Sequence, residues 1–147
     1  AGVAHFENIS GLTEKQWDEM MQVNAKGAFL CSKAVLPGMI DRGQGHIINV
    51  VSVAGRQPFP GSGGYCASKY AMQGFTDVLR MEARPHGIRV TSLMPGATAT
   101  PLWGDAPVDF DAMMQPETVA RAVLDIFNTP NDAMIEEVVL RPQGGDL

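Results

Sequence analysis

The six-residue segment 46–51, His-Ile-Ile-Asn-Val-Val, limits the possible folds of this chain more than any other part of its sequence. It is rich in β-branched residues and shows no alternation of apolar and polar side chains. This pattern is typical of a strand that is buried on both faces, as in a parallel sheet covered by helices. An α/β protein is therefore expected.

The rest of the sequence supplies the connections that a parallel sheet needs. A capping box at Thr13-Glu-Lys-Gln16 predicts a helix start, and apolar residues then recur at helical spacing. Pro37-Gly38 disturbs this pattern, and Gly43-Gln-Gly45 ends it. Pro116 opens another helix with an acidic residue in its first turn. The sequence thus predicts helices from 13 to the stop at 43–45, over 65–83 and over 116–127, and two further strands over 88–93 and 137–140.

The order of these elements predicts a partial, Rossmann-like, doubly wound parallel sheet of about three strands with their helices, in one partial domain over residues 1–147. Right-handed crossovers are expected between the strands. The strand at 46–51 would have an apolar, unpaired edge, so we expect more strands beside it in an intact sheet.

Composition restricts the possible partners and the location. The net charge is −5 and no run of Lys or Arg occurs, so neither a nucleic acid nor an anionic membrane surface is an expected partner. No apolar run is long enough to span a bilayer. Cys31 and Cys66 lack metal-ligand spacing and are interpreted as small buried apolar residues in a reducing compartment, so a cytoplasmic location is expected.

Three residues form a candidate acid/base site. Ser52 follows the 46–51 strand, at the carboxyl end where ligands bind to parallel sheets. Tyr65 and Lys69 are four residues apart and share one helical face. An ammonium about 5 Å from a phenol would lower the phenol pKa by about two units, which suits a general acid/base. Ser52 could then bond to the substrate oxygen on which charge changes.

Four motifs in order resemble the short-chain dehydrogenase/reductase family. They are Asn24 within a helix, Ser52 after a strand, Tyr65-Cys-Ala-Ser-Lys69, and the segment Pro95-Gly-Ala-Thr-Ala-Thr100. Each motif is weak alone, and the resemblance runs over almost the whole chain. It implies an NAD(P)-dependent oxidoreductase that interconverts an alcohol and a carbonyl compound, with NAD or NADP left open and no metal.

The resemblance also implies roles for individual residues. Tyr65 would be the general acid/base, Lys69 would lower its pKa and bind the nicotinamide ribose, and Ser52 would polarise the substrate oxygen. Asn24 would hold a water that links Lys69 to solvent, in a locally distorted helix. The cofactor would contact Tyr65, Lys69, Pro95, Gly96, Thr98 and Thr100, and residues 102–114 would cover the small-molecule substrate.

The sequence departs from the family in one respect. No glycine-rich turn that would bind a diphosphate follows a strand, so we expect the catalytic, C-terminal portion of such an enzyme. The alternative is a truncated, noncatalytic module that retains the oligomer interface. By the resemblance, a homodimer or homotetramer would form through the helices at 13–36 and 65–83.

Plainer interpretations of the same residues stay open. Tyr65 and Lys69 could lie on a solvated helix face, Ser52 could simply end a strand, and Thr98 and Thr100 could cap the next turn. A serine hydrolase is not favoured, because no Gly-x-Ser-x-Gly motif surrounds any serine.

Overall fold

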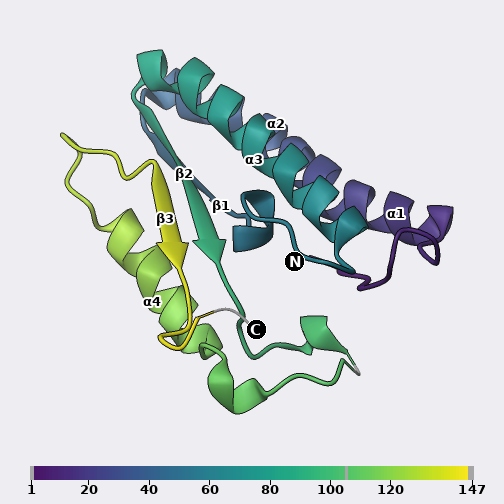
Figure 1. Cartoon of the computed structure of the whole chain (residues 1–147). Helices are drawn as coiled ribbons and strands as arrows, with labels where there is room; N and C mark the ends of the chain where they lie inside the picture. The colour runs from purple at the N-terminus through teal and green to yellow at the C-terminus, as the bar shows by residue number, and fades with distance from the viewer. Residues whose placement is uncertain (1, 105, 146–147) are drawn as a thin grey trace.

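The computed structural model describes residues 2–104 and 106–145 and contains a parallel sheet of three strands (Figure 1). The strands are β1 (Gly45–Val50), β2 (Ile88–Pro95) and β3 (Glu137–Leu140), and their order in the sheet is β1-β2-β3. The expected α/β, partial Rossmann-like architecture is confirmed. Within the described part of the chain β1 is an edge strand, and Val50 at its end is 46% exposed.

One long helical run precedes β1. It comprises α1 (Glu14–Met20), a π-helical segment (Met21–Lys26) and α2 (Gly27–Arg42), and it ends at Gly43, whose φ of 61° suits a glycine cap. The capping box is present, since the Gln16 amide donates to the Thr13 hydroxyl at 3.3 Å.

The expected disturbance at Pro37 does not interrupt the helix, because Pro37 lies inside α2, whereas the expected stop at Gly43 is confirmed. A proline removes one hydrogen bond and strains the preceding turn. Leu36, Met39 and Ile40 nevertheless pack against the core formed with β1, so burial of this last stretch outweighs that cost.

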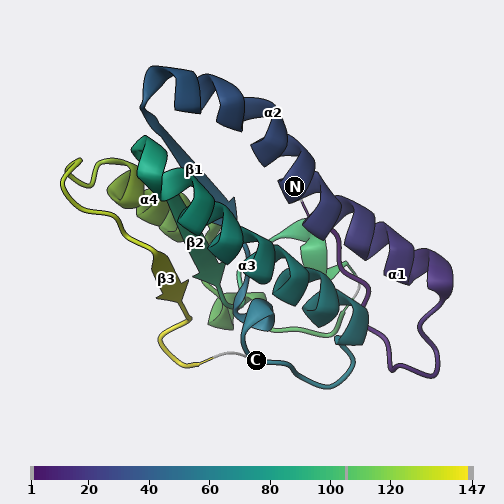
Figure 2. The ribbon, with the colours of Figure 1, turned by 90° about the horizontal axis from the view of Figure 1, so that it is seen from above.

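Helices cover both faces of the sheet. Helix α3 (Gly63–Ala83) starts two residues earlier than expected, and it packs through Leu79 and Ala83 on one face, against Ile47 and Val90. Figures 1 and 2 show α2 on the same side as α3 and α4 (Pro116–Phe127) on the other.

Contacts on the second face agree with this arrangement. The His46 ring lies 6.4 Å from the Phe127 ring, and Arg89 Nη1 donates to the Thr129 carbonyl at 2.7 Å. The core of β2 is therefore enclosed between α3 and α4, as its burial on both faces requires.

The two crossovers differ in handedness. Both connect neighbouring strands in the same direction across the sheet, yet α3 and α4 lie on opposite faces. The expectation of right-handed crossovers is therefore wrong for one of them. The connection from Pro95 to Pro116 is long enough to pass over the carboxyl end of the sheet, so α4 can begin on the far face.

A buried arginine joins α3 to the sheet. Arg80 is 7% exposed and donates to the Val90 carbonyl at 2.9 Å, the Ser92 hydroxyl at 3.0 Å and the Glu136 carbonyl at 2.9 Å. It also pairs with Asp77 at 2.9 Å. One side chain thus fixes the helix to β2 and to the residue before β3.

Two further expectations concern single residues and the membrane. Cys66 is buried as expected, but Cys31 is exposed because α2 turns that side chain away from the sheet. None of the helices in the described ranges is long and apolar enough to cross a membrane.

Candidate active site

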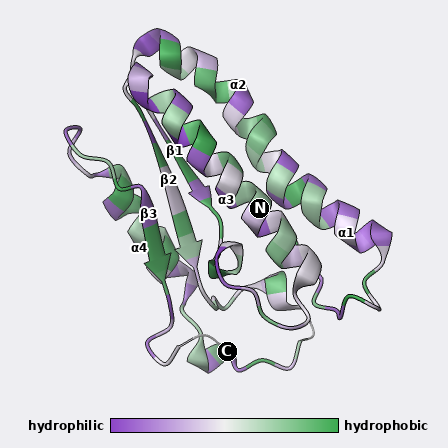
Figure 3. Ribbon diagram, turned by 45° about the horizontal axis from the view of Figure 1, so that its top comes forward, coloured by the Kyte–Doolittle hydropathy of each residue, from purple (hydrophilic) through white to green (hydrophobic). Residues whose placement is uncertain are grey.

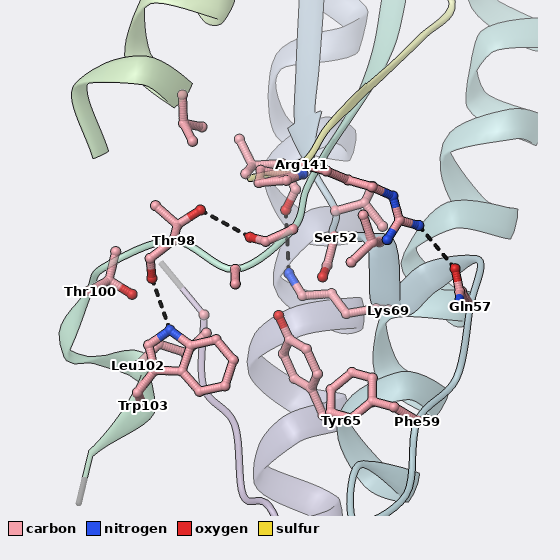
Figure 4. Close-up of a pocket in the computed structure, with 18 of the residues that line it drawn as sticks. Ser52, Gln57, Phe59, Tyr65, Lys69, Thr98, Thr100, Leu102, Trp103 and Arg141 are labelled. Carbon is pink, nitrogen blue, oxygen red and sulfur yellow. Dashed lines mark hydrogen bonds between the residues drawn. The ribbon is translucent and has the colours of Figure 1, made fainter. Parts of the chain in front are cut away.

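A pocket of about 1000 Å³ lies at the carboxyl end of the sheet (Figure 4). It is bounded by the ends of β1 and β2, the start of α3 and α4, and the connection between β2 and α4. Its volume is large enough for a small-molecule ligand. The expected residues that line it are Ser52, Tyr65, Lys69, Pro95, Gly96, Thr98 and Thr100.

Tyr65 and Lys69 occupy successive turns at the beginning of α3. They are 7% and 6% exposed, so the interpretation of this pair as a solvated helix face is wrong. The Lys69 ammonium lies 5.7 Å from the centre of the Tyr65 ring and donates to the Val50 carbonyl at 3.3 Å. The pair therefore forms a buried, polar floor of the pocket.

Burial controls the protonation of both groups. It lowers the pKa of Lys69 from 10.5 to about 8, because the ammonium loses solvation. It raises the pKa of Tyr65 above its ordinary value, an effect that a hydrogen bond with the Ser52 side chain partly offsets. The expected net lowering of the Tyr65 pKa is not seen in this structure, since desolvation of the phenolate is the largest effect on it.

Ser52 connects the sheet to α3. It is 8% exposed, and its hydroxyl accepts a hydrogen bond from the Ala54 amide at 3.1 Å, which caps the short 3-10 turn Val53–Gly55. The same side chain acts on the Tyr65 phenol. Ser52 therefore both ends a strand and reaches the candidate site.

Asn24 lies in the π-helical segment, so the expected local distortion of its helix is present. Its side chain is 3% exposed. Asn24 Oδ1 accepts a hydrogen bond from the Val3 amide at 2.9 Å, and Asn24 Nδ2 donates to the Val3 carbonyl at 2.8 Å and to the Ser68 hydroxyl at 3.0 Å. Asn24 does not line the pocket. The side chain anchors the N-terminal segment to α3, and the expected water relay stays a prediction.

The segment after β2 follows the wall of the pocket. The Thr98 hydroxyl donates to the Gly96 carbonyl at 3.0 Å, and the Gly96 amide bonds to the Leu140 carbonyl at 2.7 Å. Thr100 precedes the short 3-10 turn Pro101–Trp103 without a side-chain capping bond. The interpretation of Thr100 as a cap of the next turn is therefore wrong. The Thr98 hydroxyl bonds to the carbonyl two residues before it.

Several residues of the pocket could not be recognised from the sequence. Phe6 contacts Trp103, Tyr65 and Phe59, with ring centres 5.3, 5.8 and 6.2 Å apart. On another side, Arg141 Nη2 donates to Gln57 Oε1 at 3.0 Å (Figure 4).

Only tertiary contacts bring most of these residues to the pocket. Arg141 is the exception, because it follows β3 directly. Ligands bind at the carboxyl ends of parallel strands, and this places Arg141 at the pocket as it places Ser52 there.

The comparison with known families decides the classification. A family profile described as short chain dehydrogenase matches residues 1–109, which is most of the chain. The chain belongs to the short-chain dehydrogenase family. The resemblance inferred from the motifs is confirmed.

Members of the short-chain dehydrogenase family match the chain in sequence and in structure. A sepiapterin reductase of Chlorobaculum tepidum is 38% identical over 100% of this chain and 61% of that protein. An alcohol dehydrogenase of Thermococcus sibiricus, solved with 5-hydroxy-NADP, superposes with a TM-score of 0.88 at 29% identity, over 97% of this chain and 60% of that one.

A serine dehydrogenase solved with NADP+ has a TM-score of 0.85 at 28% identity, over 95% of this chain and 61% of that one. The chain therefore spans about three fifths of the length of each of these three relatives. The relatives are thus oxidoreductases by name, and they are longer than this chain.

The pocket fits the nicotinamide end of a cofactor. Lys69 has three donors, and among the described residues its hydrogen bond is to Val50, so donors remain for a ribose. Pro95, Gly96 and Thr98 provide a wall with little side-chain bulk beside it. No group of three or more His, Cys, Asp or Glu residues within the described ranges could hold a metal.

Proposed function

We propose that this chain forms the catalytic portion of an NAD(P)-dependent oxidoreductase that interconverts an alcohol and a carbonyl compound. The observation that carries the proposal is the buried Tyr65–Lys69 pair with Ser52, at a pocket on the carboxyl end of the sheet. A strongly perturbed, buried titratable pair in a cleft is typical of an active site.

The cofactor would supply a hydride to the carbonyl carbon. Lys69 would donate hydrogen bonds to its ribose, and Pro95, Gly96, Thr98 and Thr100 would orient its nicotinamide. Several relatives are named as complexes with NADP or a derivative, which supports a nicotinamide cofactor in this family. Because the cofactor is either NAD or NADP, turnover is to be measured with both NADH and NADPH.

Tyr65 would supply the proton that balances the hydride. As the carbonyl carbon gains the hydride, the carbonyl oxygen takes the phenol proton, so the product is the alcohol and the phenolate remains. Ser52 would hydrogen-bond to the same oxygen and stabilise its developing negative charge. The raised pKa of Tyr65 keeps the phenol protonated at neutral pH, which is the form that carbonyl reduction requires.

The two tyrosines of the chain provide a matched test. Tyr65→Phe should lower turnover in carbonyl reduction by at least ~100-fold, because the acid proton is lost and the ring is kept. Tyr70→Phe removes a phenol on the same helix that is 44% exposed and donates to the Arg56 carbonyl outside the pocket, so it should leave turnover nearly unchanged. Oxidation of NADH or NADPH, followed by absorbance, measures both.

The result that would sink the mechanism is equal turnover for Tyr65→Phe and the unmodified chain. Equal losses in both tyrosine variants would point to a general structural effect of removing a phenol from α3.

A noncatalytic module that pairs with other subunits is the second candidate. Apolar side chains are exposed along the helices proposed for the interface, among them Leu30 at 50% and Met81 at 74%. Figure 3 shows hydrophobic residues, in green, along both α2 and α3. The absence of turnover with either cofactor, together with stable self-association, would favour this candidate over the enzyme.

A further inference from the structure

The wall of the pocket beside Tyr65 is aromatic. The Phe6 ring stacks on Trp103 with an interplanar angle of 19°, meets Tyr65 edge-on at 65°, and contacts Phe59. Leu102 adds an aliphatic group to the same region. Figure 4 shows Phe59, Leu102 and Trp103 around Tyr65, on the side of the phenol away from Arg141.

This wall offers ring faces and few polar atoms. The Trp103 indole N–H donates to the Thr98 carbonyl at 2.9 Å, so the polar edge of the indole is already bonded and its orientation is fixed. The remaining surface of these side chains is suited to stacking and to edge contacts, the geometries that aromatic rings prefer.

Charge restricts the ligand further. Among the described residues that line the pocket, the charged ones are Lys69 and Arg141, and none is acidic. The wall around Phe6 therefore offers no counter-ion for a cationic substrate, and it has too few hydrogen-bonding groups to replace the water around a polyhydroxylated one.

We propose that the site takes carbonyl compounds whose carbonyl carbon carries a flat aromatic ring, and that Phe6 selects for this ring. The inference rests on the proposed function, which places the carbonyl oxygen at Tyr65 and Ser52 and the cofactor against the segment after β2. A substituent on the carbonyl carbon then extends toward Phe6 and Trp103. A planar ring contacts these faces over its whole area, whereas a puckered ring of the same carbon skeleton does not.

Two ketones and one reporter test this inference. Acetophenone and cyclohexyl methyl ketone share a skeleton and differ in the aromaticity of the ring. The chain has two tryptophans, so the indole N–H signals in an amide correlation spectrum report on Trp103 in the pocket and on Trp17 outside it. Trp17→Phe assigns the two signals.

Each ketone is titrated with and without saturating NADP+ or NAD+. We expect acetophenone to shift the Trp103 signal saturably, leave Trp17 unchanged, and bind at least about fivefold more tightly than cyclohexyl methyl ketone. Phe6→Leu should abolish this preference. Phe127→Leu replaces a 60% exposed ring on α4 outside the pocket and should keep it.

Equal dissociation constants for the two ketones, tighter binding of the saturated one, or no saturable shift of Trp103 under any condition would overturn the substrate inference. Reduction of the same ketones is measured separately. Aromatic preference in binding without turnover would count against the proposed function alone, whereas turnover without aromatic preference would count against the substrate inference alone.

Discussion

At the scale of single residues, the candidate site is governed by desolvation. Tyr65 and Lys69 are buried in the same place, and burial favours the neutral form of each. The phenol therefore holds its proton at neutral pH, while the ammonium with a pKa of about 8 is close to losing one. The two groups are poised to give up protons in different pH ranges.

The lowered pKa of Lys69 has a measurable effect on stability. Between pH 8 and pH 10.5 the unfolded chain retains a proton that the folded chain has lost, so the free energy of unfolding rises with pH. The rise should total about 3 kcal/mol, and most of it should be visible between pH 8 and pH 10.5. Above pH 10 the raised pKa of Tyr65 acts in the opposite direction.

Urea unfolding at a series of pH values measures this rise. Lys69→Met should remove it, and Lys33→Met, at an exposed position of α2, should retain it. A slope that is the same in the Lys69→Met variant as in the unmodified chain would show that Lys69 is not responsible.

At the scale of elements, α3 carries the acid/base pair near its beginning and the buried Arg80 near its end. Arg80 donates hydrogen bonds to the carbonyl of Val90 in β2 and to the carbonyl of Glu136, the residue before β3. The position of Tyr65 relative to the carboxyl end of the sheet therefore depends on contacts four turns away along the same helix.

Two arginines on this part of the chain give a matched comparison. Arg80→Met keeps an unbranched apolar stem but leaves buried carbonyls without a donor, and we expect a loss of about 3 kcal/mol in unfolding free energy. Arg84→Met removes an ion pair with Glu136 in which both side chains are more than half exposed, and the loss should stay below about 1 kcal/mol. Chemical unfolding of both variants decides between them, and equal losses would contradict a special role for Arg80.

The same elements explain what the sequence could predict. The strand at 46–51 and the spacing of Tyr65 and Lys69 are local patterns, so the sheet and the proximity of these two side chains could be inferred. The end of α2 could be inferred from Gly43, whereas the continuity of α2 through Pro37 depends on tertiary packing against β1, which leaves no local pattern. The ring of Phe6 meets Tyr65, and Asn24 holds Val3 three residues earlier; such contacts between distant residues leave no periodic signal.

At the scale of the whole molecule, apolar surface remains exposed on the helices before β1. Val23, Phe29, Leu30 and Val35 are each between 37% and 50% exposed, which is more typical of an interface than of a solvated helix. This supports the proposed self-association through α1, α2 and α3.

A charge introduced at this surface should prevent association. We expect the unmodified chain to sediment as a dimer or tetramer at tens of micromolar, and Leu30→Glu to sediment as a monomer, because a carboxylate would have to be desolvated in the interface. Leu124→Glu places the same charge on α4, where the side chain is 61% exposed, and should leave the oligomer intact. Sedimentation velocity measures this, and a monomeric unmodified chain would refute the proposal.

The change of handedness between the two crossovers has a consequence for how this architecture can diversify. The acid/base pair sits on a helix fixed by buried hydrogen bonds, while the opposite wall comes from the connection that carries the chain across the sheet to α4. Surface connections accept insertions at small entropic cost, on the order of 0.6 kcal/mol for each doubling of length. Insertions in the connection between β2 and α4 can therefore change the ligand preference of such a chain. The position of Tyr65, the proposed proton donor, would stay the same.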